Sequence, residues 1–333
     1  MTPRSNGDHV KVLYIAGWGR SGTTLVDNIL GQFDGVVSCG ELVFLWRRGL
    51  RDRRFCGCGV PLPECPLWRQ ILSQAAELNP SFSPERMLEL EEHFSRTRHF
   101  ARCALGAMAT GARRSRLFSE YCAGLASLYE AIGRVTGSRV IVDSSKSPAY
   151  AAVLANIPEL DLLVVHMTRD PRAVAHSWLR KKAQPDRGDA RLMHRHGPAY
   201  SSVMWTLYNV TLEALSRRYP SRFIHTRYED FVARPRETID RLIELTGKPV
   251  ASTPFLSERV VRLAPSHTVS GNPSRFRTGS IDITPDEEWR TQLGRRQRLV
   301  ATAGSLALLR RYGYPLRMGS TREGVAAHDG GAR

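Results

Sequence analysis

The chain has 333 residues, of which 42% are hydrophobic, and this is enough to bury one large core or the cores of two domains. Its 48 lysines and arginines outnumber 32 aspartates and glutamates, which gives a net charge of +16, and only five of the 48 are lysines. This balance favours anionic ligands, because arginine binds phosphate and sulfate through paired hydrogen bonds. The charge alone would also allow nucleic acid as a partner. We do not expect it, because the sequence lacks zinc-finger spacing, an aromatic RNA-binding motif and a helix-turn-helix pattern.

We expect neither a targeting signal nor a membrane anchor. Residues 1–9 are polar, and the apolar run that follows has only about seven residues, which is too short for a signal peptide. No stretch approaches the roughly 18 consecutive apolar residues of a transmembrane helix. The sequence therefore predicts a cytoplasmic protein with flexible termini at 1–9 and 317–333 and with mostly reduced cysteines.

Residues 10–30 predict a strand, a tight turn and a helix. Residues 10–16 are apolar and rich in β-branched side chains, as in a buried strand, and from Thr23 apolar residues recur at helical spacing. The turn between Gly17 and Gly22 has the layout of a phosphate-binding loop, in which backbone N–H groups and the helix N-terminus converge on an anion.

The loop differs from the nucleotide-binding pattern G-x-x-x-x-G-K-[ST] at one position. Thr23 stands where the pattern has the lysine that reaches the outer phosphates of a triphosphate. The sequence therefore indicates a shorter anion, which Arg20 and Ser21 could hold. A glycine turn between a strand and a helix is also common in proteins that bind no ligand there. However, the seven residues from Gly19 to Leu25 resemble the 5′-phosphosulfate loop of the sulfotransferases that use 3′-phosphoadenosine 5′-phosphosulfate (PAPS). The resemblance implies donor contacts from Gly19, Arg20, Ser21, Gly22, Thr23 and Thr24.

Glu41 follows the next short strand, residues 36–39. In an open parallel sheet this edge holds the ligand crevice, so Glu41 is a candidate general base, although it could equally cap the helix after it. Tyrosylprotein sulfotransferases and related enzymes have a similar Cys-Gly-Glu at this distance from the loop. The resemblance implies that Glu41 takes a proton from the acceptor.

Three cysteines, Cys56, Cys58 and Cys65, lie close together in a turn-rich segment. They could ligate zinc, but a structural site usually needs four ligands and the nearest histidine in sequence is His93. We therefore expect no metal here. Residues 67–136 have mostly helical patterns, and we interpret 47–136 as an insertion that shapes the acceptor side.

Two further strands end in candidate donor contacts. Lys146 follows residues 138–143, where its ammonium could stabilise charge on a leaving oxygen, or could simply be a surface lysine. Arg169 follows the strand at 160–167, and Ser177 lies eight residues later in a helix. The run from Arg169 to Ser177 resembles the 3′-phosphate motif of the same sulfotransferases, which also have a lysine two residues before a proline at the position of Lys146.

The C-terminal third supplies weaker candidates. Tyr228 follows the strand at 223–226, and the resemblance implies a place near the adenine, although it could equally be a core residue. The long polar loop 266–279 contains Arg275 and Arg277, one of which would contact the 3′-phosphate by resemblance. Residues 286–311 predict a closing helix.

Together these patterns predict a doubly wound α/β fold with a parallel sheet, in one domain spanning 10–316. The expected reaction is transfer of a sulfuryl group from PAPS to a hydroxyl on a small molecule, carbohydrate, lipid or peptide, without a metal. Glu41, Lys146 and Arg20 would be the catalytic residues, and 3′-phosphoadenosine 5′-phosphate (PAP) would be the product. Two alternatives are a small-molecule kinase or NTPase with a degenerate loop, and a non-catalytic polyanion-binding protein.

Overall fold

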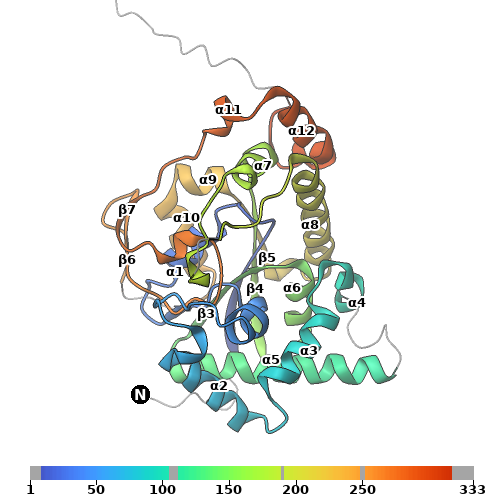
Figure 1. Ribbon diagram of the computed structural model, residues 1–333, viewed down its shortest axis with the longest axis vertical. Helices are drawn as coiled ribbons and strands as arrows, with labels where there is room; N and C mark the ends of the chain where they lie inside the picture. Colours follow the sequence, from blue (N-terminus) through green and yellow to red (C-terminus); the bar gives the residue numbers. More distant parts are fainter. Residues whose placement is uncertain (1–8, 105–111, 189–190, 248–251, 317–333) are drawn as a thin grey trace, which may run out of the picture.

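The computed structural model describes residues 9–104, 112–188, 191–247 and 252–316 (Figure 1). At its centre is a five-stranded sheet with the order β2-β3-β1-β4-β5, in which every pair of neighbours is parallel. The strands are β1 (Val10–Ala16), β2 (Val36–Ser38), β3 (Val140–Lys146), β4 (Leu160–Thr168) and β5 (Phe223–Arg227). The predicted α/β fold with a parallel sheet is confirmed.

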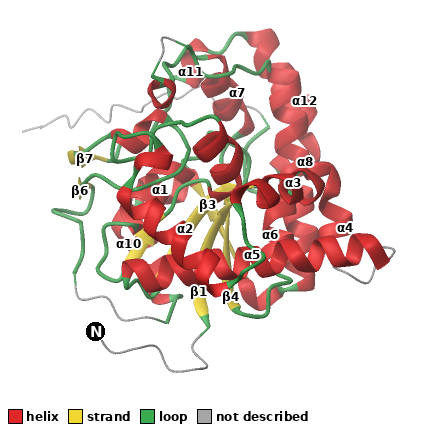
Figure 2. Ribbon diagram, turned by 60° about the horizontal axis from the view of Figure 1, so that its bottom comes forward, coloured by secondary structure: helices red, strands yellow, loops and turns green. Residues whose placement is uncertain are grey.

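The inner strands are apolar because helices cover both of their faces (Figure 2). In β1, Val12 and Tyr14 join the core cluster on one face, and Leu13 and Ile15 join the cluster on the other. The second cluster contains residues of α1 (Thr23–Leu30), α9 (Tyr228–Ala233) and α10 (Pro235–Glu244). The first contains residues of α2 (Pro66–Leu78), α3 (Pro84–Phe94), α5 (Ala112–Thr136) and α6 (Pro148–Leu154).

The segment between β2 and β3 is helical and is part of the main core. Before α2 it forms the 3₁₀ turns η1 (Leu42–Phe44) and η3 (Leu62–Glu64) and, between them, the π-helix η2 (Leu45–Arg51). After α3 it forms the 3₁₀ turn η4 (Thr97–His99) and the short helix α4 (Phe100–Ala104). Trp46, Trp68 and Tyr129 are fully buried in the cluster that also covers β1. Removal of this segment would therefore expose one face of the sheet.

The C-terminal part wraps around the edge of the sheet where the strands end. It contains α7 (Pro171–Leu179), η6 (Pro185–Arg187), α8 (Pro198–Arg218), η7 (Pro220–Arg222), η8 (Pro273–Phe276), α11 (Trp289–Gln292) and α12 (Arg295–Leu309). The single closing helix predicted at 286–311 is wrong, because an extended Leu293 separates α11 from α12. No helix in the described ranges is long and apolar enough to cross a membrane.

A second, two-stranded sheet was not predicted from the sequence. Strands β6 (Val260–Leu263) and β7 (Gly279–Asp282) pair antiparallel, with Leu263 opposite Gly279. They close off the polar loop between them at its base. The loop that carries Arg275 and Arg277 is therefore anchored at both ends.

Candidate functional site

The C-terminal ends of the parallel strands meet at one edge of the sheet, and each of them is followed by a predicted site residue. Arg20 follows β1, Glu41 follows β2, Arg169 follows β4 and Tyr228 follows β5, while Lys146 is the last residue of β3. In open α/β sheets the ligand crevice lies at this edge. The fold thus brings together residues that lie up to about 200 positions apart in the sequence.

The loop between β1 and α1 is held in a tight conformation. Arg20 and Gly22 both have positive φ angles, 76° and 85°, and the Gly17 N–H donates to the Lys146 carbonyl at 3.2 Å. A Cβ at Gly22 would lie 2.5 Å from a ring carbon of Tyr228, so only glycine fits there. No side chain caps the start of α1, which leaves that helix end open toward a ligand.

The guanidinium of Arg20 is the clearest sign of an anion site. Its carbon lies 4.6 Å from the ring centre of Trp178, and Nη2 reaches Met193 Sδ at 3.4 Å. Among the residues that the structure describes, its buried Nε and Nη1 have no hydrogen-bond partner. Burial lowers the pKa of Arg20 to about 10, so the group is still cationic at neutral pH. A buried cation with two unpaired donors is unfavourable unless an anion binds to it.

Glu41 lies between two cations. Lys146 Nζ donates a short hydrogen bond to Glu41 Oε1, and Arg48 Nη1 lies 3.8 Å from Oε2. Burial raises the pKa of Glu41, but Lys146 and Arg48 outweigh this effect and hold the pKa below its ordinary 4.5. Glu41 is therefore ionised at neutral pH. Arg48 was not identified from the sequence, because nothing in η2 distinguishes it from its arginine neighbours.

Gly271 connects the anion loop, the carboxylate and the late polar loop. A Cβ at this glycine, whose φ is 146°, would lie 3.8 Å from both Glu41 Oε1 and Thr24 Oγ1. The neighbouring Ser270 accepts a hydrogen bond from Arg48 Nη1 at 3.3 Å. The late loop thus reaches the same place as the predicted base.

Arg169 is buried beside the anion loop. Its Nη1 donates to the Arg20 carbonyl at 3.3 Å, and its guanidinium stacks on Tyr228 at 4.2 Å from the ring centre. Its Nη2 lies 3.2 Å from the Asp286 carboxylate, which also pairs with Arg180 at 2.7 Å. A carboxylate shared by two arginines occupies the kind of position that a phosphate oxygen would take.

The other predicted contacts differ in how accessible they are. Ser177 is buried in α7, and Arg277 is exposed. Arg275 is only 3% exposed, and it donates to the carbonyls of Thr268 at 2.5 Å and Phe55 at 2.6 Å. Lys182 was not identified from the sequence; burial, followed by repulsion from Arg20 and other cations that include Arg277, lowers its pKa to about 8.

A cluster of possible metal-ligating side chains was only partly identified from the sequence. The three cysteines of the turn-rich segment, Cys56, Cys58 and Cys65, lie together, and His267 completes the group. The histidine is 202 residues from Cys65 in sequence, so no local spacing pattern could have indicated it. It belongs to the polar loop that the sequence singled out for another reason.

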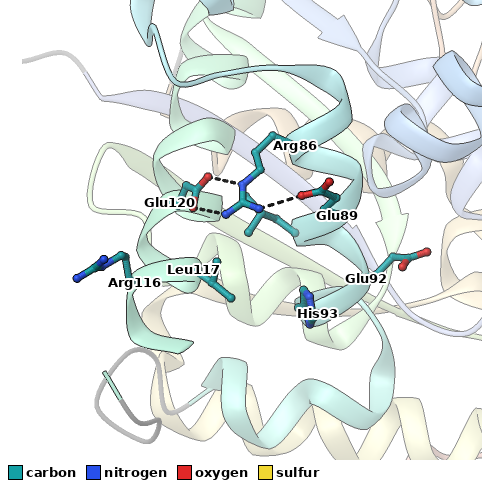
Figure 3. A pocket seen from close by; sticks show the side chains of 8 residues that line it. Arg86, Glu89, Glu92, His93, Arg116, Leu117 and Glu120 are labelled. Atoms are coloured by element: carbon teal, nitrogen blue, oxygen red, sulfur yellow. Dashed lines mark hydrogen bonds and ion pairs between the residues drawn. The ribbon is translucent and has the colours of Figure 1, made fainter. Parts of the chain in front are cut away.

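A surface hollow between α3 and α5 carries none of the predicted residues (Figure 3). There Arg86 donates to Glu120 and Glu89, and those interactions engage its charged nitrogens. The hollow is lined mainly by charged side chains, of which Arg86, Glu89 and Glu120 pair with one another, and we assign it no ligand.

Comparisons with known proteins identify a family and a similar fold. A model described as "Sulfotransferase family" matches residues 13–252. The sulfotransferase domain of the olefin synthase from Synechococcus PCC 7002 is similar in fold, with a TM-score of 0.51 and 18% identity, covering 94% of this chain and 98% of that one. A sulfotransferase domain from the curacin biosynthetic pathway has a TM-score of 0.48 and 15% identity over 92% and 99% of the two chains. No curated protein matches.

Proposed function

This chain belongs to the sulfotransferase family, and from that premise we propose that it transfers a sulfuryl group from PAPS to an acceptor hydroxyl. Membership, which the loop motif predicted, makes the protein a sulfuryl transferase; the donor, the base and the acceptor are the proposal. The observation that carries the donor assignment is the buried Arg20 guanidinium, whose Nε and Nη1 have no partner among the described residues. It lies in a loop whose backbone can bind a second part of the same anion.

We assign the 5′-phosphosulfate to the loop and the 3′-phosphate to Arg169. The loop offers Arg20, the amides at the start of α1 and the hydroxyls of its first residues, and it has no lysine for a triphosphate. Arg169 and Ser177 would hold the 3′-phosphate. For this, the Asp286 carboxylate must leave Arg169, or share it with the phosphate.

The remaining donor contacts follow from position. Tyr228 packs against Gly22 and under Arg169, and these contacts support a role for its ring in donor binding, near the adenine in our proposal. Of the two late arginines we favour Arg277 for the donor, because it is exposed and close enough to Lys182 to affect its charge. Arg275 is already bonded to two backbone carbonyls, so its proposed part is to hold the loop in place.

The proposed reaction needs a base at the acceptor hydroxyl and a cation at the leaving oxygen of the donor. In the proposed step Glu41 takes the proton of the acceptor hydroxyl while the new oxygen–sulfur bond forms. The bond between sulfur and the bridging oxygen breaks, and its electron pair stays on the 5′-phosphate of PAP. Lys146, which pairs with Glu41 in this structure, would turn to that bridging oxygen, so Glu41 becomes a stronger base when the donor is present. No metal is needed in this scheme.

The acceptor would enter from the side of the segment 47–136. Arg48 belongs to this segment and contacts Glu41, so the segment reaches the reacting centre. The class of hydroxyl compound stays open between a small molecule, a carbohydrate, a lipid and a peptide. A screen of such compounds with a radiolabelled sulfuryl donor would identify it.

The first experiment is a thermal-shift titration of the full chain with PAP, ADP and ATP plus Mg²⁺. Saturation at 100-fold over Kd adds about 2.7 kcal/mol of stability, or roughly 4 °C for a chain of this size. We expect the shift with PAP, without metal, and little with ADP. A shift that requires ATP and Mg²⁺ would replace the proposal with a kinase. Equal weak shifts with every polyanion would indicate a binding protein without nucleotide specificity.

A further inference from the structure

The four side chains Cys56, Cys58, Cys65 and His267 converge on one point. Their ligand atoms, three Sγ and a ring nitrogen, all lie within 4.8 Å of one another. The Sγ atoms of Cys58 and Cys65 are 3.8 Å apart, and His267 Nδ1 lies 3.3 Å from Cys65 Sγ and 3.8 Å from Cys56 Sγ. Three thiols and an imidazole form one compact group at the junction of two segments.

These distances match the edges of a metal-centred tetrahedron. With metal–sulfur bonds of about 2.3 Å and a metal–nitrogen bond of about 2.0–2.1 Å, sulfur–sulfur edges are about 3.8 Å and sulfur–nitrogen edges about 3.5 Å. A disulfide requires sulfur atoms about 2.05 Å apart, and it would leave one thiol and the imidazole over. The structure places no disulfide on any of the six cysteines among the described residues.

We propose that Cys56, Cys58, Cys65 and His267 bind one structural Zn²⁺ ion. This is contrary to the sequence-based expectation, which had only three ligands to consider. Four protein ligands fill the coordination shell, so the ion has no open position for a substrate and acts on the fold. Zinc takes the thiols as thiolates, so its binding releases up to three protons to solvent, while the imidazole binds as the neutral ring.

The backbone around the cluster is shaped to present the ligands. The Gly59 N–H donates to the Cys56 carbonyl at 2.9 Å, which closes a turn, and Gly59 has a φ of 90° that favours glycine. Gly57 lies so close to the other segment that a Cβ there would be 2.5 Å from the Ser266 carbonyl oxygen. Trp68 Nε1 donates to the His267 carbonyl at 2.7 Å, and this hydrogen bond holds the backbone of the histidine in place.

The ion would fasten the late polar loop to the segment between β2 and β3. Next to the cluster, Arg275 donates to the carbonyls of Phe55 and Thr268, each one residue from a ligand. The same loop continues to Gly271, which lies beside Glu41 and Thr24. Loss of the ion would therefore loosen the loop where it meets the site.

The test is the metal content of the full chain, purified under reducing conditions from cells supplied with zinc. We expect about one zinc ion per chain. Cys58→Ser should lose most of it, because three ligands hold zinc much less tightly. Cys122→Ser is the matched control, since Cys122 is a half-buried cysteine in α5 outside the cluster, and it should keep the full content.

A second measurement keeps the proposal testable if the cysteine variant folds poorly. Replacement of zinc by Co²⁺ should give the intense visible and near-ultraviolet bands of tetrahedral thiolate coordination. His267→Cys should retain the metal with altered bands, and His267→Ala should bind it much more weakly. A chelator should lower the Tm of the wild type but not that of Cys58→Ser.

Three results would overturn the proposal. The wild type could contain no zinc although zinc and reductant were present. Cys58→Ser could hold as much as Cys122→Ser. Alternatively, mass spectrometry of the intact chain could show a disulfide between Cys58 and Cys65 in protein that has never been exposed to oxidant.

Discussion

At the scale of single residues, Glu41 has the protonation state that a base in this position needs. Its pKa lies below 4.5 because Lys146 and Arg48 outweigh the effect of burial, so it is ionised at neutral pH. Glu41→Gln removes the proton acceptor but keeps the shape and the hydrogen bond from Lys146. We expect turnover to fall by about 10²–10⁴-fold while PAP binds with similar affinity. Initial rates with the screened acceptor and calorimetry with PAP would measure both.

The control for Glu41 is another buried glutamate that pairs with an arginine. Glu91, 1% exposed and bonded to Arg47, lies in α3, which carries no site residue. Glu91→Gln should keep turnover even if it lowers stability. Near-normal turnover of Glu41→Gln would contradict its assignment as the base.

A variant of Arg169 tests the proposed contact with the 3′-phosphate of the donor. Arg169→Ala should weaken PAP by about 10–100-fold, because a hydrogen-bonded charge pair is worth about 1.5–3 kcal/mol. It should weaken AMP, which lacks the 3′-phosphate, far less. AMP is also the control for damage to the loop, since Arg169 bonds to the Arg20 carbonyl as well. Equal losses for PAP and AMP, measured by calorimetry, would remove Arg169 from the 3′-phosphate site.

Asp27 links the stability of the site to pH. It is buried in α1, where the hydroxyls of Ser38 and Ser144 donate to its carboxyl, and burial raises its pKa to about 7 from 3.8. Between these two values the folded state holds a proton that the unfolded state has lost. The contribution of Asp27 to the free energy of unfolding therefore falls as the pH rises from about 4, and it is lost once the pH has passed about 7.

Asp27→Asn cannot lose a proton, and its amide can bond to the same two serines. We expect the free energy of unfolding of this variant to fall less between pH 5 and pH 8 than that of the wild type. Each unit by which the pKa of Asp27 differs between the folded and unfolded states is worth about 1.4 kcal/mol. Urea denaturation at both pH values would measure it. Identical pH dependence in the two proteins would show that Asp27 is ionised throughout.

At the scale of elements, the loop between β1 and α1 depends on Gly22. Alanine there meets two obstacles: a φ of 85°, and a ring carbon of Tyr228 at 2.5 Å from the new Cβ. Gly279 is a matched control, because its φ is 86° and no described residue lies within 4 Å of its Cβ position. Gly279→Ala should cost about 1–2 kcal/mol of stability from backbone strain alone. Gly22→Ala should cost about 1–3 kcal/mol more and abolish PAP binding. Equal Tm values for the two variants would refute the proposed fit.

How well each element could be predicted depends on how local its cause is. The strands β1, β3 and β4 could be predicted because burial on both faces makes them continuous apolar runs. The pair β6 and β7 could not, since each has only four residues and their place depends on pairing with each other and on burial of Val261 and Leu263 against the main core. Within 67–136, where mostly helical patterns were predicted, α3 ends at Phe94 and the short elements η4 and α4 follow it, a break that no local pattern marks; residues 105–111 lie outside the described residues.

At the scale of the whole molecule, the parallel sheet explains why the site could be predicted in part. Residues that follow parallel strands must meet at one edge, so Arg20, Glu41, Lys146 and Arg169 became candidates from their positions, and the motif resemblance then favoured a functional role for them. Arg48, Asp286 and His267 come from segments whose place is set by tertiary packing, and no periodicity or spacing marks them. Arg275 was a candidate donor contact, but its hydrogen bonds to backbone carbonyls also depend on tertiary packing and could not be predicted from the sequence.

The net charge of +16 should act on the donor before any contact forms. A positive field concentrates an anionic ligand near the site and raises its association rate, and salt screens that field beyond a Debye length of about 10 Å at 0.1 M. The association rate of PAP should therefore fall steeply between about 50 and about 500 mM salt, while the dissociation rate changes little.

AMP provides the comparison, since at neutral pH it carries a charge of about −2 against about −4 for PAP. If the field of the whole protein steers the ligand, the salt slope of the association rate should be about twice as large for PAP as for AMP. Stopped-flow fluorescence of the tryptophans would follow both, because Trp178 stacks on Arg20 in the loop. Equal slopes for the two nucleotides would mean that only the contacts inside the site sense their charge, and that the excess of arginine serves another purpose.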